Sequence, residues 1–142
     1  MTDKEKFKII VEYIKDLSIE TPSATTLLFV RENIAKYNLD IDISSSALKN
    51  NLLEIVTKLT LQDKKNNKEK AFFEIKYASI ISIDKSVIDK KEISKIVLCD
   101  LQNAVYPKIQ NIFLDFIRKS GYPELNIEKT INFEKLYNDK FN

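Results

Sequence analysis

Histidine is absent from this 142-residue chain, and glycine and cysteine occur once each. Without histidine, the chain has no Ser–His or Cys–His pair, no histidine metal cluster and no side chain that ordinarily exchanges protons near neutral pH. The single glycine, Gly121, leaves no phosphate-binding loop of the G-x-x-x-x-G-K-[ST] or G-x-G-x-x-G type. Carboxylate or lysine catalysis stays open, but no spacing singles out a pair. We therefore expect no enzyme, no cofactor and no metal site.

Other scarce features bear on the compartment and on the partners. Cys99 is the only cysteine, so no internal disulfide can form, which suits a reducing cytoplasm. No run of about 18 apolar residues is present for a membrane span, and the N-terminal MTDKEKFK lacks the apolar segment of a secretory signal. The 23 basic and 21 acidic residues nearly balance. Lysines interspersed in this way are typical of a solvated surface. The sequence thus predicts a cytoplasmic protein without nucleic-acid binding or direct membrane insertion.

Hydrophobic patterns predict one domain over residues 1–142, with strands first and helices after. Alternating apolar residues predict strands near residues 7–20, 38–44, 53–61 and 71–83. In the first strand we expect one face to carry Phe7, Ile9, Val11 and Tyr13. A turn is expected around Ser45 and Ser46, and the charged run of residues 63–70 is expected to form a hairpin loop.

The second half of the chain follows a helical period. Helical spacing predicts one helix at residues 89–104, broken before Pro107, and another from Pro107 to a left-handed cap at Gly121. Asn132 suits the N-cap of a last helix, whereas residues 25–36 fit either a short helix or an irregular crossover. The predicted fold class is α+β, a four-stranded antiparallel sheet with helices packed on one face.

Several stretches of the chain form a specific combination when they are taken in order. They are YIKDLSIETPSA from Tyr13, LDIDISSSALKNNLLEIVTKLTL from Leu39, AFFEIKYASIISI from Ala71, YPKIQNIFLDFIRKSGYPELNI from Tyr106 and NFEKLY from Asn132. In this order and with these intervals, the stretches resemble the SecB family of protein-export chaperones. The resemblance implies a homotetramer, assembled as a dimer of dimers. It would bind unfolded precursor proteins without ATP, keep them export-competent and deliver them to the SecA translocation ATPase.

The resemblance also implies which residues contact SecA: Asp16, Glu20, Phe72 and Glu74. A holdase needs exposed apolar grooves rather than reactive side chains, since unfolded clients offer apolar side chains and unpaired backbone. We expect the client groove to be lined by Leu39, Ile41, Ile43, Phe133, Leu136 and Tyr137. For each of these residues, burial in an ordinary core is the alternative.

Two other functions remain open from the residues alone. One is a SecB-like chaperone for another client, such as an antitoxin; the acidic SecA-contact set favours export over this reading. The other is a basic nucleic-acid-binding domain, but the only dense basic run, Lys64 to Lys70, contains no stacking aromatic residue. Members of the family are usually acidic, so the near-balanced charge of this chain predicts weaker electrostatic steering toward SecA.

Overall fold

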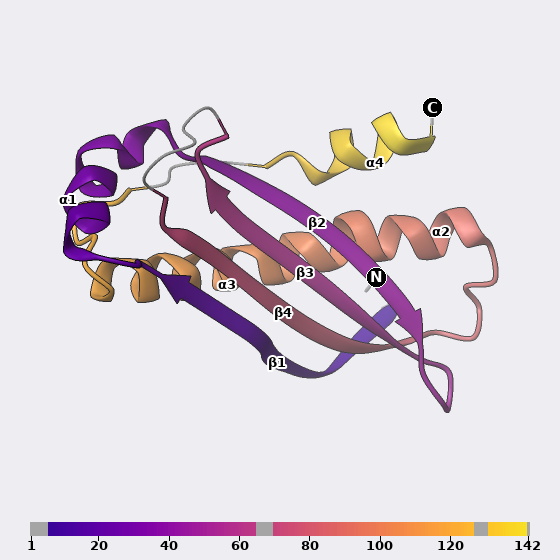
Figure 1. The fold of residues 1–142 in the computed structure, drawn as a ribbon. Helices are drawn as coiled ribbons and strands as arrows, with labels where there is room; N and C mark the ends of the chain where they lie inside the picture. Colours follow the sequence, from indigo (N-terminus) through magenta and orange to yellow (C-terminus); the bar gives the residue numbers. More distant parts are fainter. Residues whose placement is uncertain (1–5, 65–69, 127–130, 142) are drawn as a thin grey trace.

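Four antiparallel strands form a single sheet in the computed structural model, which describes residues 6–64, 70–126 and 131–141. The strands are β1 (Phe7–Glu20), β2 (Asn38–Ala47), β3 (Leu52–Gln62) and β4 (Phe72–Ile83), and their order across the sheet is β1-β4-β3-β2 (Figure 1). β1 and β2 are therefore the two edges. The predicted sheet is confirmed, and residues 65–69 of the predicted hairpin loop lie outside the described residues.

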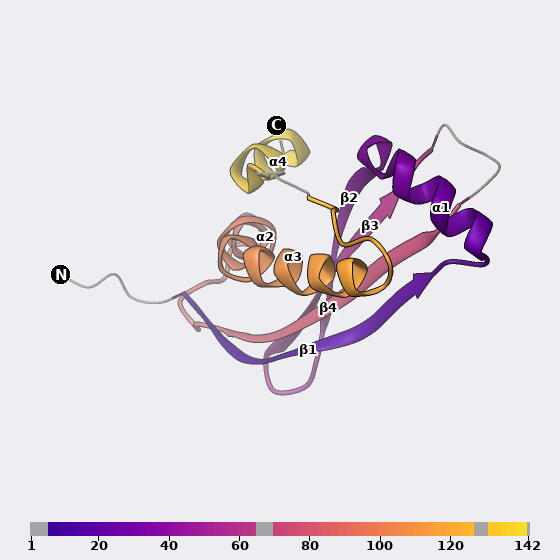
Figure 2. The same cartoon turned by 90° about the vertical axis from the view of Figure 1, so that its left-hand side faces the viewer.

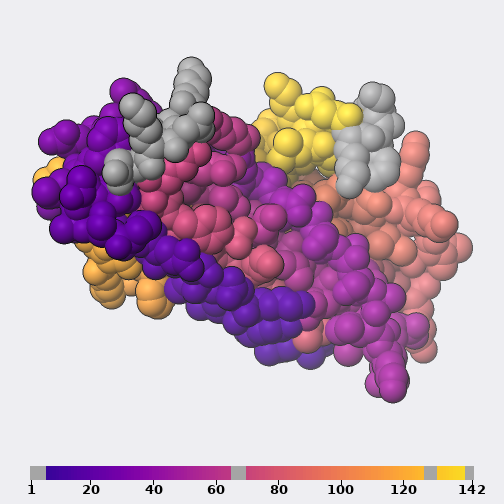
Figure 3. Space-filling view, in the orientation of Figure 1, coloured from indigo at the N-terminus to yellow at the C-terminus, as the bar shows by residue number. Residues whose placement is uncertain are grey.

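The helices cover one face of this sheet, as the sequence predicts. The chain passes from β1 to β2 through α1 (Ala24–Asn33) and η1 (Ile34–Lys36), which confirms the helical alternative for this segment. After β4 it forms α2 (Lys90–Lys95), η2 (Ile96–Asp100), α3 (Leu101–Lys119) and α4 (Phe133–Phe141). α2 and α3 lie against one face, α1 sits at one end of the sheet, and α4 lies beside α2 and η2 (Figures 1 and 2). The opposite face, here called the outer face, is turned toward the viewer in Figures 1 and 3, and no helix of the described residues lies over it.

The core lies between the inner face of the sheet and α3. β3 and β4 contribute residues at every second position, the spacing that points side chains to one face of a strand. Those residues are Ile55, Leu59 and Leu61 of β3 and Phe73, Ile75 and Ile81 of β4, all 0 to 2% exposed. From α3, Ile109, Phe113 and Ile117 close the core at helical spacing. Phe116 of the same predicted stripe is 43% exposed, so the stripe is narrower than predicted.

The face assignment in β1 was wrong beyond Ile9. The pairing of β1 with β4 shifts between Ile9 and Val11 and again between Ile14 and Asp16. Each extra residue reverses the alternation of side chains. Val11 and Tyr13 therefore join the outer face, where they pair with Ile80 and Ala78 and remain 46% and 37% exposed.

The predicted break before Pro107 was also wrong, because α3 begins at Leu101 and continues through the proline. Proline in a helix interior costs about 3 kcal/mol, since it lacks the N–H that bonds the carbonyl four residues earlier. Here Val105 and Ile109 on either side of Pro107 are fully buried against the sheet. Burial of one such side chain contributes about 1.5–3 kcal/mol, so tertiary packing offsets the local cost.

Three further local predictions concern chain reversals and caps. Ser45 and Ser46 lie inside β2 rather than in a turn; the reversal comes later, where Asn50 and Asn51 have φ values of 63° and 59°. Asparagine tolerates this left-handed conformation better than most residues do. The left-handed glycine at Gly121 is confirmed with φ of 112°. The N-cap at Asn132 is confirmed as well, since its Oδ1 accepts a hydrogen bond from the N–H of Lys135 at 3.0 Å.

Candidate functional site

The four residues expected to contact SecA lie together on the outer face of the sheet. Glu20 is paired with Phe72 across β1 and β4, and Ser18 beside it is paired with Glu74. Asp16 and Glu20 stand at even spacing on β1, so both carboxylates project from the same face. Phe72 is 42% exposed, and both β1 acids are exposed. The structure thus forms one surface, here called the acidic patch, from Asp16, Glu20, Phe72 and Glu74.

Basic groups adjoin the acidic patch. The Nζ of Lys58 on β3 lies 4.0 Å from Oε1 of Glu74, and the hydroxyl of Thr60 donates to the same oxygen at 3.5 Å. Lys76 of β4 is paired directly with Asp16. These lysines partly offset the negative charge of the patch, as the near-balanced composition would suggest. Exposed pairs of this kind contribute little to stability, about 0–1 kcal/mol each.

A second set of polar contacts crosses the outer face next to the acidic patch. Glu54 of β3 accepts a hydrogen bond from the hydroxyl of Tyr13 and pairs with Nζ of Lys15 at 2.8 Å. These contacts reach from β1 to β3 across β4. The hydrogen bonds from Lys15 and Tyr13 hold the pKa of the Glu54 carboxyl below its ordinary value. These two contacts with Glu54 hold the segment of β1 that precedes Asp16 in place on the outer face.

Glu12 makes similar side-chain hydrogen bonds on the side of β1 that faces the helices. Its carboxylate accepts hydrogen bonds from the hydroxyl of Tyr77 at 3.0 Å and from Nζ of Lys108 on α3 at 3.1 Å. Burial, and then the hydrogen bond to Glu12, raise the pKa of Tyr77 to about 12. Sequence reasoning missed both glutamates, because their partners are 39 to 96 residues away along the chain. The only sequence feature that could have pointed to Glu12 and Glu54 is that each is an acidic residue within an otherwise apolar strand segment.

The β2 part of the expected client groove lies on the inner face at the edge of the sheet. Leu39 is paired with Leu61 and Ile41 with Leu59, so these side chains share the core-facing side of β3. Leu39 is only 6% exposed, whereas Ile41 and Ile43 are half-buried. A cavity of about 170 Å³ adjoins Leu39 and is also lined by Ile34, Tyr37, Leu61 and Leu125.

The α4 part of the expected groove lies on the helical layer. Phe133 is 3% exposed and packs edge-to-face on Tyr106 of α3, with ring centroids 5.3 Å apart. The hydroxyl of Tyr137 donates to the backbone carbonyl of Lys91 at 3.1 Å. Leu136 is 43% exposed. A cavity of about 250 Å³ lies between α3 and the start of α4, lined by Gln102, Asn103, Tyr106, Pro107, Gln110, Ile131 and Phe133.

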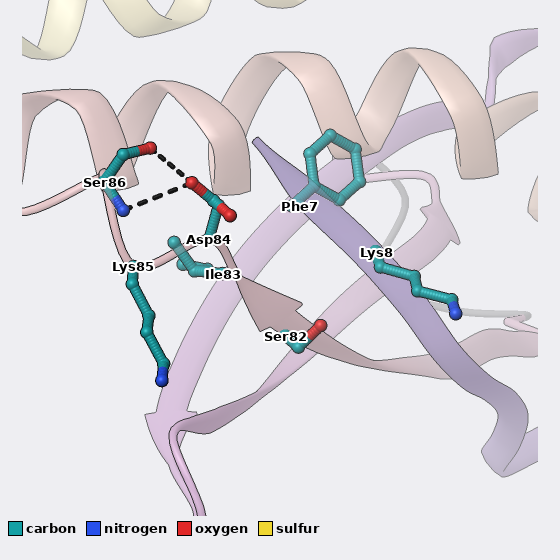
Figure 4. Close-up of a pocket in the computed structure, with 7 residues that line it drawn as sticks. All are labelled: Phe7, Lys8, Ser82, Ile83, Asp84, Lys85 and Ser86. Carbon is teal, nitrogen blue, oxygen red and sulfur yellow. Dashed lines mark hydrogen bonds between the residues drawn. The ribbon is translucent and has the colours of Figure 1, made fainter. Parts of the chain in front are cut away.

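A further cavity, of about 540 Å³, opens where β1 begins and β4 ends (Figure 4). Asp84 accepts hydrogen bonds there from the backbone N–H and the hydroxyl of Ser86. The amines of Lys8 and Lys85 extend in different directions, so they do not converge on one anion (Figure 4). Among the described residues, no three acidic, cysteine or histidine side chains gather in a way that could hold a metal ion. No helix in the same residues is long and apolar enough to cross a membrane.

Comparison with known proteins agrees with the resemblance. The whole chain, residues 1–142, matches the family described as "Preprotein translocase subunit SecB". A putative protein-export protein SecB of Pelagibacter ubique is 48% identical over 97% of this chain and 99% of its own length. A protein-export protein SecB of Rhodospirillum centenum is 25% identical over 89% of this chain and 74% of its own length.

A solved structure shares the fold at lower sequence identity. It is a SecB-like chaperone of Mycobacterium tuberculosis in complex with a peptide from an antitoxin. The likeness covers 88% of this chain and 91% of that chain, with a TM-score of 0.63 and 15% identity. At this identity the likeness extends to the fold alone.

Proposed function

This chain belongs to the SecB family of preprotein translocase subunits and is a protein-export chaperone, and we propose that it works through two separate surfaces of one domain over residues 1–142. Apolar surface around β2 and α4 holds unfolded precursors, while the acidic patch on the outer face docks onto SecA in the cytoplasm. No catalysed reaction, cofactor or nucleotide takes part. Two surfaces on different elements allow a client to remain bound while SecA is engaged.

The single observation that carries the SecA proposal is the pairing of Glu20 with Phe72. An exposed ring flanked by carboxylates offers an apolar anchor within an acidic rim, an arrangement that suits a partner with a basic, partly apolar surface. Charge on the rim contributes mainly to the association rate and to the register of docking. Lys58 and Lys76 beside the patch reduce its charge, so we expect weaker steering than a wholly acidic face would give.

The proposed client surface combines apolar groups from two elements. Ile41 and Ile43 on β2 and Leu136 and Tyr137 on α4 keep exposed area, whereas Leu39 and Phe133 are buried in the chain without a client. Half-exposed apolar side chains along an edge can accept apolar segments of many sequences, because burial of apolar area is not directional. Several weak contacts along one long client then add through effective concentration.

Self-assembly as a homotetramer, a dimer of dimers, is part of the same proposal. Strand β1 lies at an edge of the sheet, and its free edge pairs with no strand among the described residues. It carries four exposed apolar side chains, Ile10, Val11, Tyr13 and Ile14. An apolar, unpaired edge of this kind favours association with another chain. Size-exclusion chromatography with light scattering is expected to give four chains per particle, and a monomer would contradict the assembly.

The antitoxin-client alternative is not favoured, because the two relatives described above are named as protein-export proteins. The antitoxin peptide is bound to a structural neighbour that is only 15% identical to this chain.

The holdase function is tested by dilution of a denatured, slowly refolding protein into buffer with or without this chain and without nucleotide. We expect suppressed aggregation at micromolar chaperone. Undiminished aggregation, together with binding to folded proteins or RNA, would overturn the proposal.

A further inference from the structure

Tyr106 of α3 lines the cavity between α3 and the start of α4, and its hydroxyl is buried. Tyr106 is 5% exposed, and its hydroxyl has no hydrogen-bond partner among the described residues. Burial raises the pKa of this phenol, so the hydroxyl keeps its proton at any physiological pH. An unsatisfied buried hydroxyl costs about 1–3 kcal/mol, and native proteins contain few such groups.

An acceptor without its usual donor lies on the same cavity. Pro107 lines the cavity from within α3 and has no N–H. In a regular helix that N–H would bond the carbonyl of Asn103, which lines the same cavity. One turn of α3 therefore presents an unpaired donor, from Tyr106, and a carbonyl deprived of its helical donor, from Asn103. Apolar contacts from Ile131 and Phe133 form the opposite side.

A donor and an acceptor on one turn, beside an apolar side, complement one peptide unit of an extended polypeptide. We propose that this cavity is a subsite for the backbone of an unfolded client. The hydroxyl of Tyr106 donates to a client carbonyl, and the carbonyl of Asn103 accepts from a client N–H. A neighbouring apolar client side chain packs on Phe133. The inference rests on the proposed holdase function and adds to it a polar recognition element that does not depend on client sequence.

Access to this subsite requires α4 to move outward, because Phe133 covers Tyr106. The helix is held there by that ring contact and by the bond from Tyr137 to the carbonyl of Lys91. Client binding would give the Tyr106 hydroxyl the partner that it lacks, so opening α4 removes this defect of the closed arrangement. A client without an apolar side chain would gain less, since it could not replace the packing on Phe133.

Two substitutions in the full-length chain test the subsite, with a reduced, carboxymethylated lactalbumin as the permanently unfolded probe. Tyr106→Phe removes only the hydroxyl, and Pro107→Ala restores the N–H that satisfies Asn103. Each variant is expected to be at least as stable as the natural chain in urea and to bind the probe about two- to tenfold more weakly. Tyr122→Phe is the matched control, because its buried hydroxyl is bonded to Thr21 at 2.8 Å. It should lose stability and keep its affinity for the probe.

Unchanged probe affinity in either Tyr106→Phe or Pro107→Ala would overturn the proposal. Lower stability of Tyr106→Phe would overturn it too, because that loss would mean that the hydroxyl already has a partner. Failure of the natural chain to bind the probe would instead remove the holdase function itself. Normal binding by the natural chain, with unchanged binding by the variants, would remove only the subsite.

Discussion

Glu20 and Phe72 occupy directly paired positions on β1 and β4, so a carboxylate and a 42%-exposed ring stand side by side on the outer face. Directly opposed residues in an antiparallel pair have Cβ atoms about 5 Å apart, close enough for one partner surface to contact both. Asp16 lies two alternations further along the same face of β1. Because the carboxylates of this surface are exposed, the SecA proposal can be tested by measuring SecA binding at different salt concentrations.

Replacing Asp16 and Glu20 together by Asn and Gln should weaken SecA binding about three- to tenfold at low salt and much less at high salt. Exposed carboxylates act through screened Coulomb attraction, which adds about 0.2–1 kcal/mol per pair and fades as the Debye length shortens. Fluorescence anisotropy titrations at two ionic strengths measure the effect. Asp115→Asn with Glu134→Gln makes the same change in net charge on the helical layer, away from the outer face, and should have little influence. Equal losses at both ionic strengths would argue against an electrostatic role.

Gln102 and Thr57 form a buried polar pair between α3 and β3. Both are at most 1% exposed, and Nε2 of Gln102 donates to the Thr57 hydroxyl at 2.9 Å. Gln102→Leu should lower the free energy of unfolding by about 1–3 kcal/mol, because it leaves the Thr57 hydroxyl buried without a partner. Urea denaturation measures the loss. Adding Thr57→Val should recover part of it, and a double variant less stable than the single one would contradict this account.

Glu54 should make stability depend on pH in the acid range. Its folded-state pKa lies below the ordinary value of 4.5, so the ionised form is favoured by folding. The contribution is therefore present above about pH 4.5 and is lost as pH falls through the lowered folded-state pKa. Urea unfolding between pH 3 and 7 should show Glu54→Gln less stable than the natural chain near neutrality, with the gap closing in acid. A gap for Glu54→Gln that stays constant with pH would rule out the linkage.

Sequence reasoning predicted the sheet, the one-sided helical layer and the cap at Asn132, because each depends on residues close together in the chain. It failed at Val11 and Tyr13, since one inserted residue in β1 reverses the alternation and leaves no mark in the pattern itself. It failed at Pro107 because a local rule on helix breaking takes no account of the burial of Val105 and Ile109.

The candidate sites were predictable to different degrees. The acidic patch came from the resemblance, whereas the pairing of Glu20 with Phe72 depends on strand register that periodicity alone does not fix. The contact of Glu54 with Tyr13 joins residues 41 positions apart and has no local signal. The apolar pattern predicted a strand at β2 and a helix at α4, which the structure confirms, whereas their role as a client surface stays a prediction. The pattern could not separate buried Leu39 from exposed Leu136, since both are apolar residues on an amphipathic element.

That contrast between Leu39 and Leu136 gives the sharpest test of the client surface. Leu136→Ser removes apolar area from a side chain that is 43% exposed, so it should weaken binding of an unfolded client severalfold at nearly unchanged stability. Leu39→Ala, at 6% exposure, should lower the free energy of unfolding by about 2–5 kcal/mol through the cavity it creates. Thermal unfolding and client titration on both variants separate the two effects. Leu28→Ser on α1, at a leucine that is 61% exposed, is the control for loss of an exposed leucine outside the groove. If Leu136→Ser and Leu28→Ser reduce client binding equally, clients bind exposed apolar side chains anywhere on the surface, and α4 does not form a wall of the groove.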